Sequence, residues 1–116
     1  MNILVILNDS PDGTERTFNG LRLAGALARR PDVSARVFLM ADAAGGAKVG
    51  QKVPQDFYHV GRMVQVVHQH GGEVGVCGSC MDARGLTDAD LIEGARRNSM
   101  EELADWTVWA DRVVVF

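Results

Sequence analysis

The sequence has little of what nucleic-acid-binding and membrane proteins contain. Lys and Arg number 12 against 15 Asp and Glu, which gives a formal charge of −3 and no basic excess for a phosphate backbone. Aromatic residues make up only 6% of the chain, too few to predict a base-stacking surface. The longest apolar runs, residues 3–7 and 113–116, are far shorter than a membrane-spanning helix. We therefore expect neither a nucleic-acid partner nor a membrane partner.

Neither a secretion signal nor a domain boundary is visible. The chain has 116 residues, 47% of them hydrophobic and 23% charged, which is typical of one globular domain. No linker, repeat or low-complexity segment divides it. Asn2 and Ile3 run directly into an apolar segment, without the charged region and cleavage site of a signal peptide. These features predict a single domain over residues 1–116 in the cytoplasm.

Strand-like and helix-like segments alternate along the chain. Residues 3–7 and 35–40 are apolar runs typical of strands that are covered on both faces. Between them, a capping arrangement of Asp12 with Glu15 is expected to open a helix. Apolar and small residues recur there at helical spacing: Phe18, Leu21, Gly25 and Ala28. This order predicts a right-handed parallel β-α-β crossover.

The rest of the chain continues the alternation. Segment 41–54, rich in Gly and Ala, lacks the spacing of a phosphate-binding loop and is predicted to be a flexible surface loop. Further helices are expected over residues 57–70, 87–93 and 99–110, and further strands over residues 73–76, 95–97 and 112–116. The expected buried stripes are Phe57, Val60, Val64 and Val67 in the first of these helices and Met100, Leu103, Thr107 and Ala110 in the last.

Capping patterns and turns set the predicted boundaries. Thr87 with Asp90, and Ser99 with Glu102, have the spacing of capping boxes that open helices. Residues 78–86 are predicted to form a turn, across which Asp82 and Arg84 would pair.

This alternation predicts an open, doubly wound α/β sheet. In such sheets ligands bind beyond the carboxyl ends of the strands, where the winding direction reverses. We expect the first and third strands to flank that point. Residues 8–10 and the tetrapeptide CGSC at residues 77–80 would then share one crevice. Asp9 would either orient a ligand there or form an Asx turn.

The only two cysteines, Cys77 and Cys80, lie in that tetrapeptide. A structural disulfide usually closes a long loop, and a bond between these two would close almost none. Two buried, unreactive cysteines are the alternative. Because Cys77 leaves the carboxyl end of a predicted strand, we favour a nucleophilic or sulfur-carrying Cys77, with Cys80 as the second or resolving thiol.

Neighbouring residues suit a reactive thiolate. Arg84 would bring a positive charge that favours the thiolate, and Ser79 could donate a hydrogen bond to it or to a bound sulfur species. Gly78 and Gly85 would allow the tight backbone that the turn requires. The predicted site therefore includes these four residues as well as Asp9.

Residues 76–86, VCGSCMDARGL, resemble the signature segment of the DsrE/DsrF-like family. That family includes the sulfur-relay proteins of the DsrEFH and TusBCD complexes and the stand-alone YchN-like proteins. The likeness extends over most of the chain and includes residues 99–104 (SMEELA) and 110–116 (ADRVVVF). It implies a three-layer α/β/α fold with a parallel, five-stranded sheet, and assembly into homo- or hetero-oligomers.

In the relay members of this family, one cysteine in this segment accepts a persulfide sulfur and passes it on. Counted back from Arg84 and Gly85, Cys77 occupies that position. The resemblance implies a sulfur carrier or sulfurtransferase that works with donor and acceptor proteins. Cys80 departs from the relay members that have a single cysteine here, and in this respect the chain is similar to the stand-alone branch.

Two other functional classes remain open. A Cys-Gly-x-Cys sequence is also typical of thioredoxin-like dithiol oxidoreductases, in which the motif opens a long helix. Here the motif leads into a predicted turn, and no proline follows it. The other class is a non-enzymatic oligomer that binds a small ligand, or senses the redox state, in the same crevice.

No metal ion or other cofactor is expected. One pair of cysteines falls short of the three or four ligands that zinc requires. His68 and His70 are two residues apart and do not share a helical face.

The last predicted helix carries both tryptophans of the chain. Trp106 and Trp109 widen its apolar face beyond what one helix of a small domain usually buries. We therefore expect the protein to self-associate.

Overall fold

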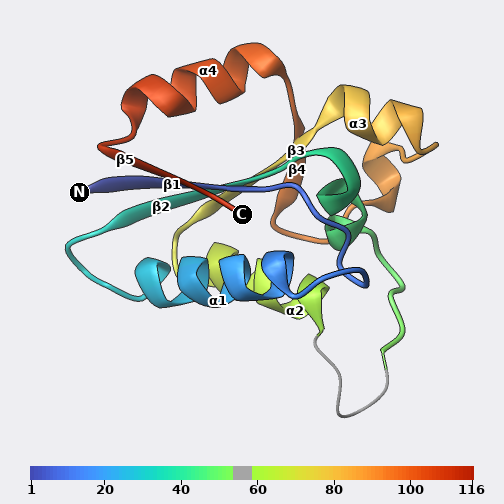
Figure 1. The fold of residues 1–116 in the computed structure, drawn as a ribbon, viewed down its shortest axis with the longest axis horizontal. Helices are drawn as coiled ribbons and strands as arrows, with labels where there is room; N and C mark the ends of the chain where they lie inside the picture. Colours follow the sequence, from blue (N-terminus) through green and yellow to red (C-terminus); the bar gives the residue numbers. More distant parts are fainter. Residues whose placement is uncertain (54–58) are drawn as a thin grey trace.

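Five parallel strands form the centre of the structure. The computed structural model describes residues 1–53 and 59–116 (Figure 1). The strands are β1 (Asn2–Leu7), β2 (Ser34–Leu39), β3 (Glu73–Cys77), β4 (Ala95–Asn98) and β5 (Arg112–Val115). Their order across the sheet is β4-β3-β2-β1-β5, and every neighbouring pair is parallel. The predicted parallel, five-stranded sheet is confirmed.

Helices cover both faces of this sheet. The α-helices are α1 (Arg16–Ala28), α2 (Val60–Gln69), α3 (Gly78–Ala83) and α4 (Met100–Trp109), and the 3-10 helices are η1 (Ala41–Ala47) and η2 (Asp88–Asp90). Figure 1 shows α1 and α2 on one face of the sheet and α4 on the other, so the predicted three-layer α/β/α architecture is correct. In the described residues, no helix combines the length and apolar composition that crossing a membrane requires.

Side-chain alternation along the strands builds two separate cores. The larger core lies between the sheet and helices α1 and α2, where Val5, Val76 and Val64 have no exposed surface. The smaller core lies under α4 and consists of Leu4, Phe38, Cys77, Leu103 and Trp106. Because neighbouring residues of a strand face opposite sides of the sheet, Val76 faces α1 and α2 whereas Cys77 faces α4.

The segment after β3 is a helix, and the predicted turn over residues 78–86 is wrong. Cys77 is the N-cap residue of α3, and its Sγ accepts a hydrogen bond from the Cys80 N–H at 3.3 Å. A side-chain acceptor at this position satisfies a backbone donor of the first helical turn. Cysteine is not among the residues that usually mark a helix start, which is why the sequence pattern did not indicate α3.

Residues 41–47 are also more ordered than the predicted flexible loop over 41–54, whose last residue lies outside the described ranges. They form η1, in which Ala43, Ala44 and Ala47 have no exposed surface. Small side chains let this backbone pack closely against α2, since a Cβ added to Gly46 would lie 3.0 Å from Val60 Cγ1. The alanines that suggested a flexible surface loop are therefore core residues.

Helix starts were predicted with mixed success. The N–H of Glu102 donates to Ser99 Oγ, and the capping box of Thr87 with Asp90 is present. The short helix that this box opens ends at Asp90 instead of residue 93. Helix α1 begins after Glu15 without a side-chain cap, so the capping arrangement predicted there is wrong.

The buried stripes of two helices were predicted in part. In α2, the three valines of the predicted stripe are buried, while Phe57 lies outside the described residues. In α4, Leu103 and Trp106 are buried, whereas Met100 is 63% exposed. At the second turn of α4, the buried residue is therefore Trp106 and not the predicted Thr107.

Both tryptophans have partners within the chain. Trp106 packs edge-on against Phe38, with 6.0 Å between the ring centroids. The Arg36 guanidinium lies 3.9 Å from the ring centroid of Trp109, and Glu73 holds it there through a 2.6 Å ion pair. Trp106 is therefore buried within the chain and Trp109 is partly covered by Arg36, while the expected self-association stays a prediction.

Candidate functional site

The winding of the sheet reverses between β3 and β4. Strand β2 separates β1 from β3, so the expectation that the first and third strands flank the reversal is wrong. After β3 the chain enters α3, whose Met81 is packed in the core of α1 and α2, whereas after β4 it enters α4 on the opposite face. Connections that leave neighbouring strands toward opposite faces open a crevice at their carboxyl ends.

A groove of about 450 Å³ occupies this place. Its lining comes from the carboxyl ends of β2, β3 and β4 and from the first turns of α3 and α4: Phe38, Cys77, Gly78, Ser79, Arg97, Asn98, Ser99, Met100 and Glu102. Three of the predicted site residues, Cys77, Gly78 and Ser79, are among them.

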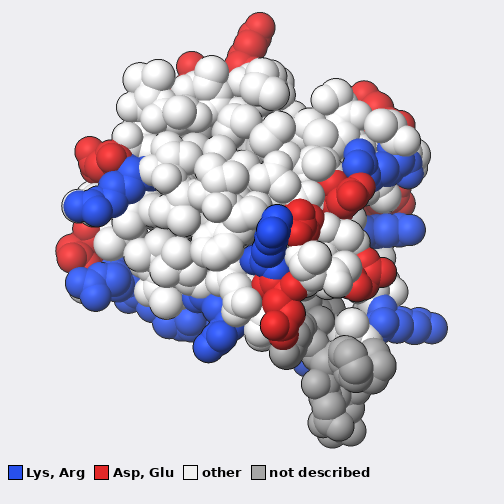
Figure 2. All heavy atoms as spheres, in the orientation of Figure 1, with Lys and Arg blue, Asp and Glu red and all other residues white. Residues whose placement is uncertain are grey.

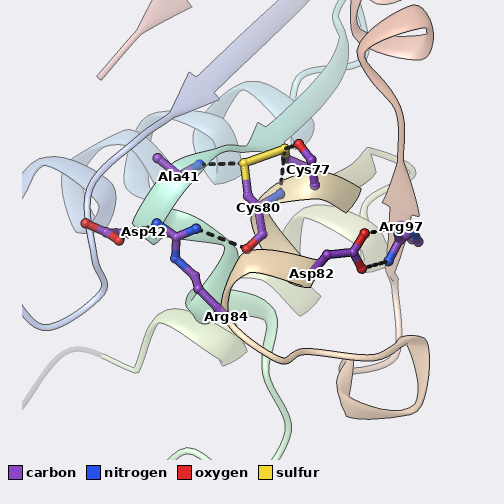
Figure 3. The surroundings of a disulfide bond; sticks show 8 residues. Ala41, Asp42, Cys77, Cys80, Asp82, Arg84 and Arg97 are labelled. Carbon is purple, nitrogen blue, oxygen red and sulfur yellow. Dashed lines mark hydrogen bonds and ion pairs between the residues drawn. A yellow bond between two sulfur atoms is a disulfide. The ribbon is translucent and has the colours of Figure 1, made fainter.

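A disulfide joins the two cysteines beside the groove (Figure 3). Cys77 ends β3 and Cys80 lies in α3, with 5.2 Å between their Cα atoms. Cys77 is only 6% exposed, and its Sγ lies 3.4 Å from Ser79 Oγ. The Ala41 N–H donates to Cys80 Sγ at 3.2 Å. Each sulfur thus has a hydrogen-bond donor within reach, and a donor of this kind also stabilises a thiolate.

Ala41 presents its N–H to Cys80 from an unfavourable backbone conformation. Its φ is 49°, in the left-handed region that disfavours residues with a side chain. The next turn of η1 holds it there, because the Ala43 N–H bonds to the carbonyls of Asn8 and Met40. No pattern in the sequence indicated that this alanine contacts the cysteine pair.

Arg84 contacts the main chain of the cysteine segment. Its guanidinium donates to the Cys80 carbonyl at 3.0 Å and to Asp42 Oδ1 at 2.6 Å (Figure 3). The ion pair with Asp42 replaces the expected pairing of Arg84 with Asp82. Gly85, with a φ of 67°, supplies the left-handed backbone that follows α3.

Arg97 is a site residue that the sequence analysis missed. Its guanidinium binds the Asp82 carboxylate through two hydrogen bonds of 2.8 Å, which tie β4 to α3. Hydrogen bonding and the positive charge of Arg97 lower the pKa of Asp82, and the same bonds raise the pKa of Arg97. The guanidinium also lies against Gly78, where an added Cβ would come within 2.9 Å of Arg97 Nε.

Asn98 is the second residue that was missed. It is the parallel-strand partner of Cys77 and is 3% exposed. Its Oδ1 accepts a 2.6 Å hydrogen bond from Arg96, while its Nδ2 is buried and has no partner among the residues that the structure describes. Leaving such a donor unsatisfied costs about 1–3 kcal/mol.

Asp9 lies outside the groove lining. Its Oδ2 accepts a 2.6 Å hydrogen bond from Thr14, and its carbonyl accepts another of 2.6 Å from Thr17. These hydrogen bonds lie within the segment that joins β1 to α1, and β2 separates β1 from β3, which carries Cys77. The crevice that we expected Asp9 to share with Cys77 is therefore not formed.

Within residues 1–53 and 59–116, no three side chains of His, Cys, Asp or Glu come together in a way that could hold a metal ion. The groove instead offers a disulfide, hydroxyl and amide donors, and the guanidinium of Arg97, which is already paired with Asp82.

Comparison with known proteins extends the likeness from the motif to the entire chain. Residues 1–116 match the DsrE/DsrF-like family. Protein YchN of Escherichia coli strain K12 is 37% identical over 115 residues, which cover 98% of this chain and 97% of YchN. The crystal structure of the E. coli YchN protein superposes with a TM-score of 0.92, covering 99% of this chain and 98% of that one.

A solved structure of much lower sequence identity shares the fold. Protein MTH1491 from Methanobacterium thermoautotrophicum, whose function is described as unknown, superposes with a TM-score of 0.78 at 13% identity, covering 99% of this chain and 98% of that one.

Proposed function

This chain belongs to the DsrE/DsrF-like family, and on that basis we propose that it carries sulfane sulfur as a persulfide on Cys77, with Cys80 as the resolving thiol. The observation that carries the proposal is the Cys77–Cys80 pair itself. The two sulfurs are close enough to bond, and Cys77 lies in the wall of a groove at the edge of the sheet where α/β proteins bind ligands.

Loading begins from the reduced pair. A dithiol reductant supplies two electrons and two protons, which convert the disulfide to two thiols while the reductant becomes a disulfide. The Cys77 thiolate then attacks the outer sulfur of a donor persulfide, R–S–SH. A bond forms between Cys77 Sγ and that sulfur, the donor S–S bond breaks, and R–S⁻ leaves. The product, Cys77–S–SH, involves no net oxidation.

Release follows by one of two routes. An acceptor thiolate attacks the outer sulfur and restores the Cys77 thiolate, which completes transfer. Alternatively, the Cys80 thiolate attacks Cys77 Sγ, forms the Cys77–Cys80 bond and expels hydrosulfide, HS⁻. This second route would leave the same Cys77–Cys80 bond that the structure contains, and the short distance between the two cysteines is what supports Cys80 as the resolving thiol.

The disulfide also favours a second candidate, a dithiol oxidoreductase that exchanges Cys77–Cys80 with the thiols of a substrate. Helix α3 removes one objection to it, because the motif opens a helix as it does in thioredoxin-like proteins. That helix has only six residues, and the sheet around it is entirely parallel. The two candidates differ in whether a sulfur atom is ever added to the protein.

Intact-protein mass spectrometry separates them. The reduced protein is incubated with a small-molecule persulfide donor. Each sulfur atom that binds to a cysteine thiolate adds about 32 Da to the mass of the protein. We expect a reductant-labile adduct that is absent in Cys77→Ser and accumulates in Cys80→Ser, which cannot expel hydrosulfide. Rapid disulfide exchange without any adduct would overturn the carrier proposal in favour of the oxidoreductase. Unreactive thiols would leave the groove as a site for a small ligand.

We further propose that the protein self-associates through the edge formed by β5. Val113 and Val115 are 41% and 61% exposed, and Val108 of α4 is 87% exposed. β5 is an edge strand of the described sheet, next to β1, and Figure 2 shows a broad area without charged side chains on the face where β5 lies. Light scattering should report more than one chain per particle, and Val115→Lys should reduce it. A monomer at every concentration would refute this.

A further inference from the structure

We propose that Asn98 is the residue that holds the sulfur carried by Cys77, with its unpaired Nδ2 donating a hydrogen bond to the outer sulfur of the Cys77 persulfide. This inference rests on the proposed loading of Cys77 and assigns a binding role to a side chain that neither the cysteine motif nor its neighbours include.

The register of the sheet places Asn98 beside the reacting sulfur. Asn98 of β4 pairs with Cys77 of β3, and both residues line the groove. Gly75 lies two residues before Cys77 and therefore faces the same side of the sheet. A Cβ added to Gly75 would meet Asn98 Nδ2 before any other atom and would also contact Trp106, so the free end of the amide lies over this glycine, below Trp106, on the face that Cys77 shares.

The orientation of the amide is determined by its other end. Asn98 Oδ1 accepts a 2.6 Å hydrogen bond from Arg96, and Arg96 is held in turn by Glu102 at 2.9 Å. Exchanging the amide oxygen and nitrogen would place an N–H against the guanidinium. Nδ2 is therefore the free end, with two N–H groups and no acceptor in the part of the chain that the structure describes.

A deprotonated persulfide supplies what this amide lacks. Its outer sulfur is anionic and accepts hydrogen bonds without offering a donor. The two arginines near the cysteines are less suited to meet it, because Asp42 binds Arg84 and Asp82 binds Arg97. Ser79 Oγ, at 3.4 Å, serves the inner sulfur of Cys77. Asn98 Nδ2 is the buried side-chain donor of the groove lining that has no acceptor among the described residues, and we assign it to the outer sulfur.

The test uses the Cys80→Ser background, in which a persulfide on Cys77 is not resolved. Loaded protein is treated with an alkylating agent over a range of pH, which gives the midpoint at which the persulfide anion forms. The charged groups around the amide are Arg96, Arg97 and Glu102, and all three are kept unchanged in every variant. Adding Asn98→Ala removes the donor, and adding Asn98→Asp replaces it with a carboxylate of the same shape.

We expect Asn98→Ala to raise the pH midpoint of persulfide ionisation, so that the deprotonated fraction at a pH below the midpoint falls several-fold. Asn98→Asp should lower that fraction tenfold or more. Asn19→Asp, which changes charge on the exposed surface of α1, should leave the midpoint unchanged. Thermal unfolding identifies the variants that are folded at the assay temperature. If Asn98→Asp is not folded, Asn98→Ala alone tests the proposal.

Different outcomes refute the two proposals. If the Cys80→Ser parent takes up no sulfur, the proposed function fails and this inference falls with it. If the parent loads but the midpoint is the same with Asn98, alanine and aspartate, Asn98 only packs between β3, β4 and α4, and the inference is overturned while the carrier function stands.

Discussion

Reduction of the Cys77–Cys80 disulfide should cost this protein about 2 kcal/mol and leave it folded. The bond joins residues three apart in sequence, so it restricts the unfolded chain only slightly. The hydrogen bonds that position the two sulfurs come from the N–H groups of Cys80 and Ala41, and thiols accept both of them as well. The folded state therefore keeps its contacts when the bond is broken.

The magnitude follows from the length of the loop. For a closed loop of four residues, the loss of unfolded-chain entropy corresponds to about 2 kcal/mol at 25 °C. With the average unfolding entropy of a globular chain of this length, that loss lowers the melting temperature by about 8 °C. A carrier or an oxidoreductase needs this property, because its fold must persist in both redox states.

Thermal unfolding with and without a phosphine reductant, followed by circular dichroism, measures the difference. Cys80→Ser, which has no disulfide, serves as the control and should not respond to the reductant. A fall in melting temperature of more than 20 °C, or loss of the fold at 25 °C, would show that the bond is structural. The reasoning on loop length would then be refuted, and the redox cycle proposed for Cys77 would lose its basis.

Three further predictions concern the residues around the groove. Gly75→Ala should destabilise the protein by about 1–3 kcal/mol, because its Cβ would overlap the buried amide below α4; Gly45→Ala, whose Cβ meets nothing within 4 Å, should be neutral in the same urea titration. The pKa of Asp82 lies below its ordinary value because of Arg97, so the pair stabilises the fold above the ordinary carboxyl pKa of about 3.9 and this contribution is lost as the pH falls through the lowered pKa. An NMR titration of the carboxyl group should show the pKa returning to its ordinary value in Arg97→Ala, and an unchanged pKa would contradict the assignment. Arg36→Lys should lower the free energy of unfolding by about 1 kcal/mol and shift tryptophan fluorescence to longer wavelength. Lysine covers the indole of Trp109 less completely than a stacked guanidinium does.

Local signals in the sequence predicted the five strands and helices α1, α2 and α4. Apolar runs such as residues 3–7 predicted strands, and the capping residue Ser99 marked the start of α4. These signals act between residues a few positions apart, so they can be read without knowing the rest of the structure. The same locality explains two errors: α3 starts at a cysteine cap, and the alanines of η1 are buried only because α2 packs over them.

The candidate site was predicted only in its cysteine half. Cys77, Gly78 and Ser79 line the groove as expected, because consecutive residues at the end of a strand stay together in any fold. Arg97 and Asn98 follow a short polar strand, ARRN, that carries no catalytic motif. They reach the site because β4 pairs with β3, a contact that the sequence does not reveal.

The sequence by itself determined the fold class, the family and the position of the thiols at the carboxyl end of a strand. Each of these depends on residue types and on spacings within one segment. Only the tertiary structure decided which strand lies beside β3, and hence that Asn98 rather than Asp9 stands next to Cys77. Strand order depends on how the connecting helices pack over both faces of the sheet, and the free energy of that packing is distributed over the whole chain rather than encoded in any short motif.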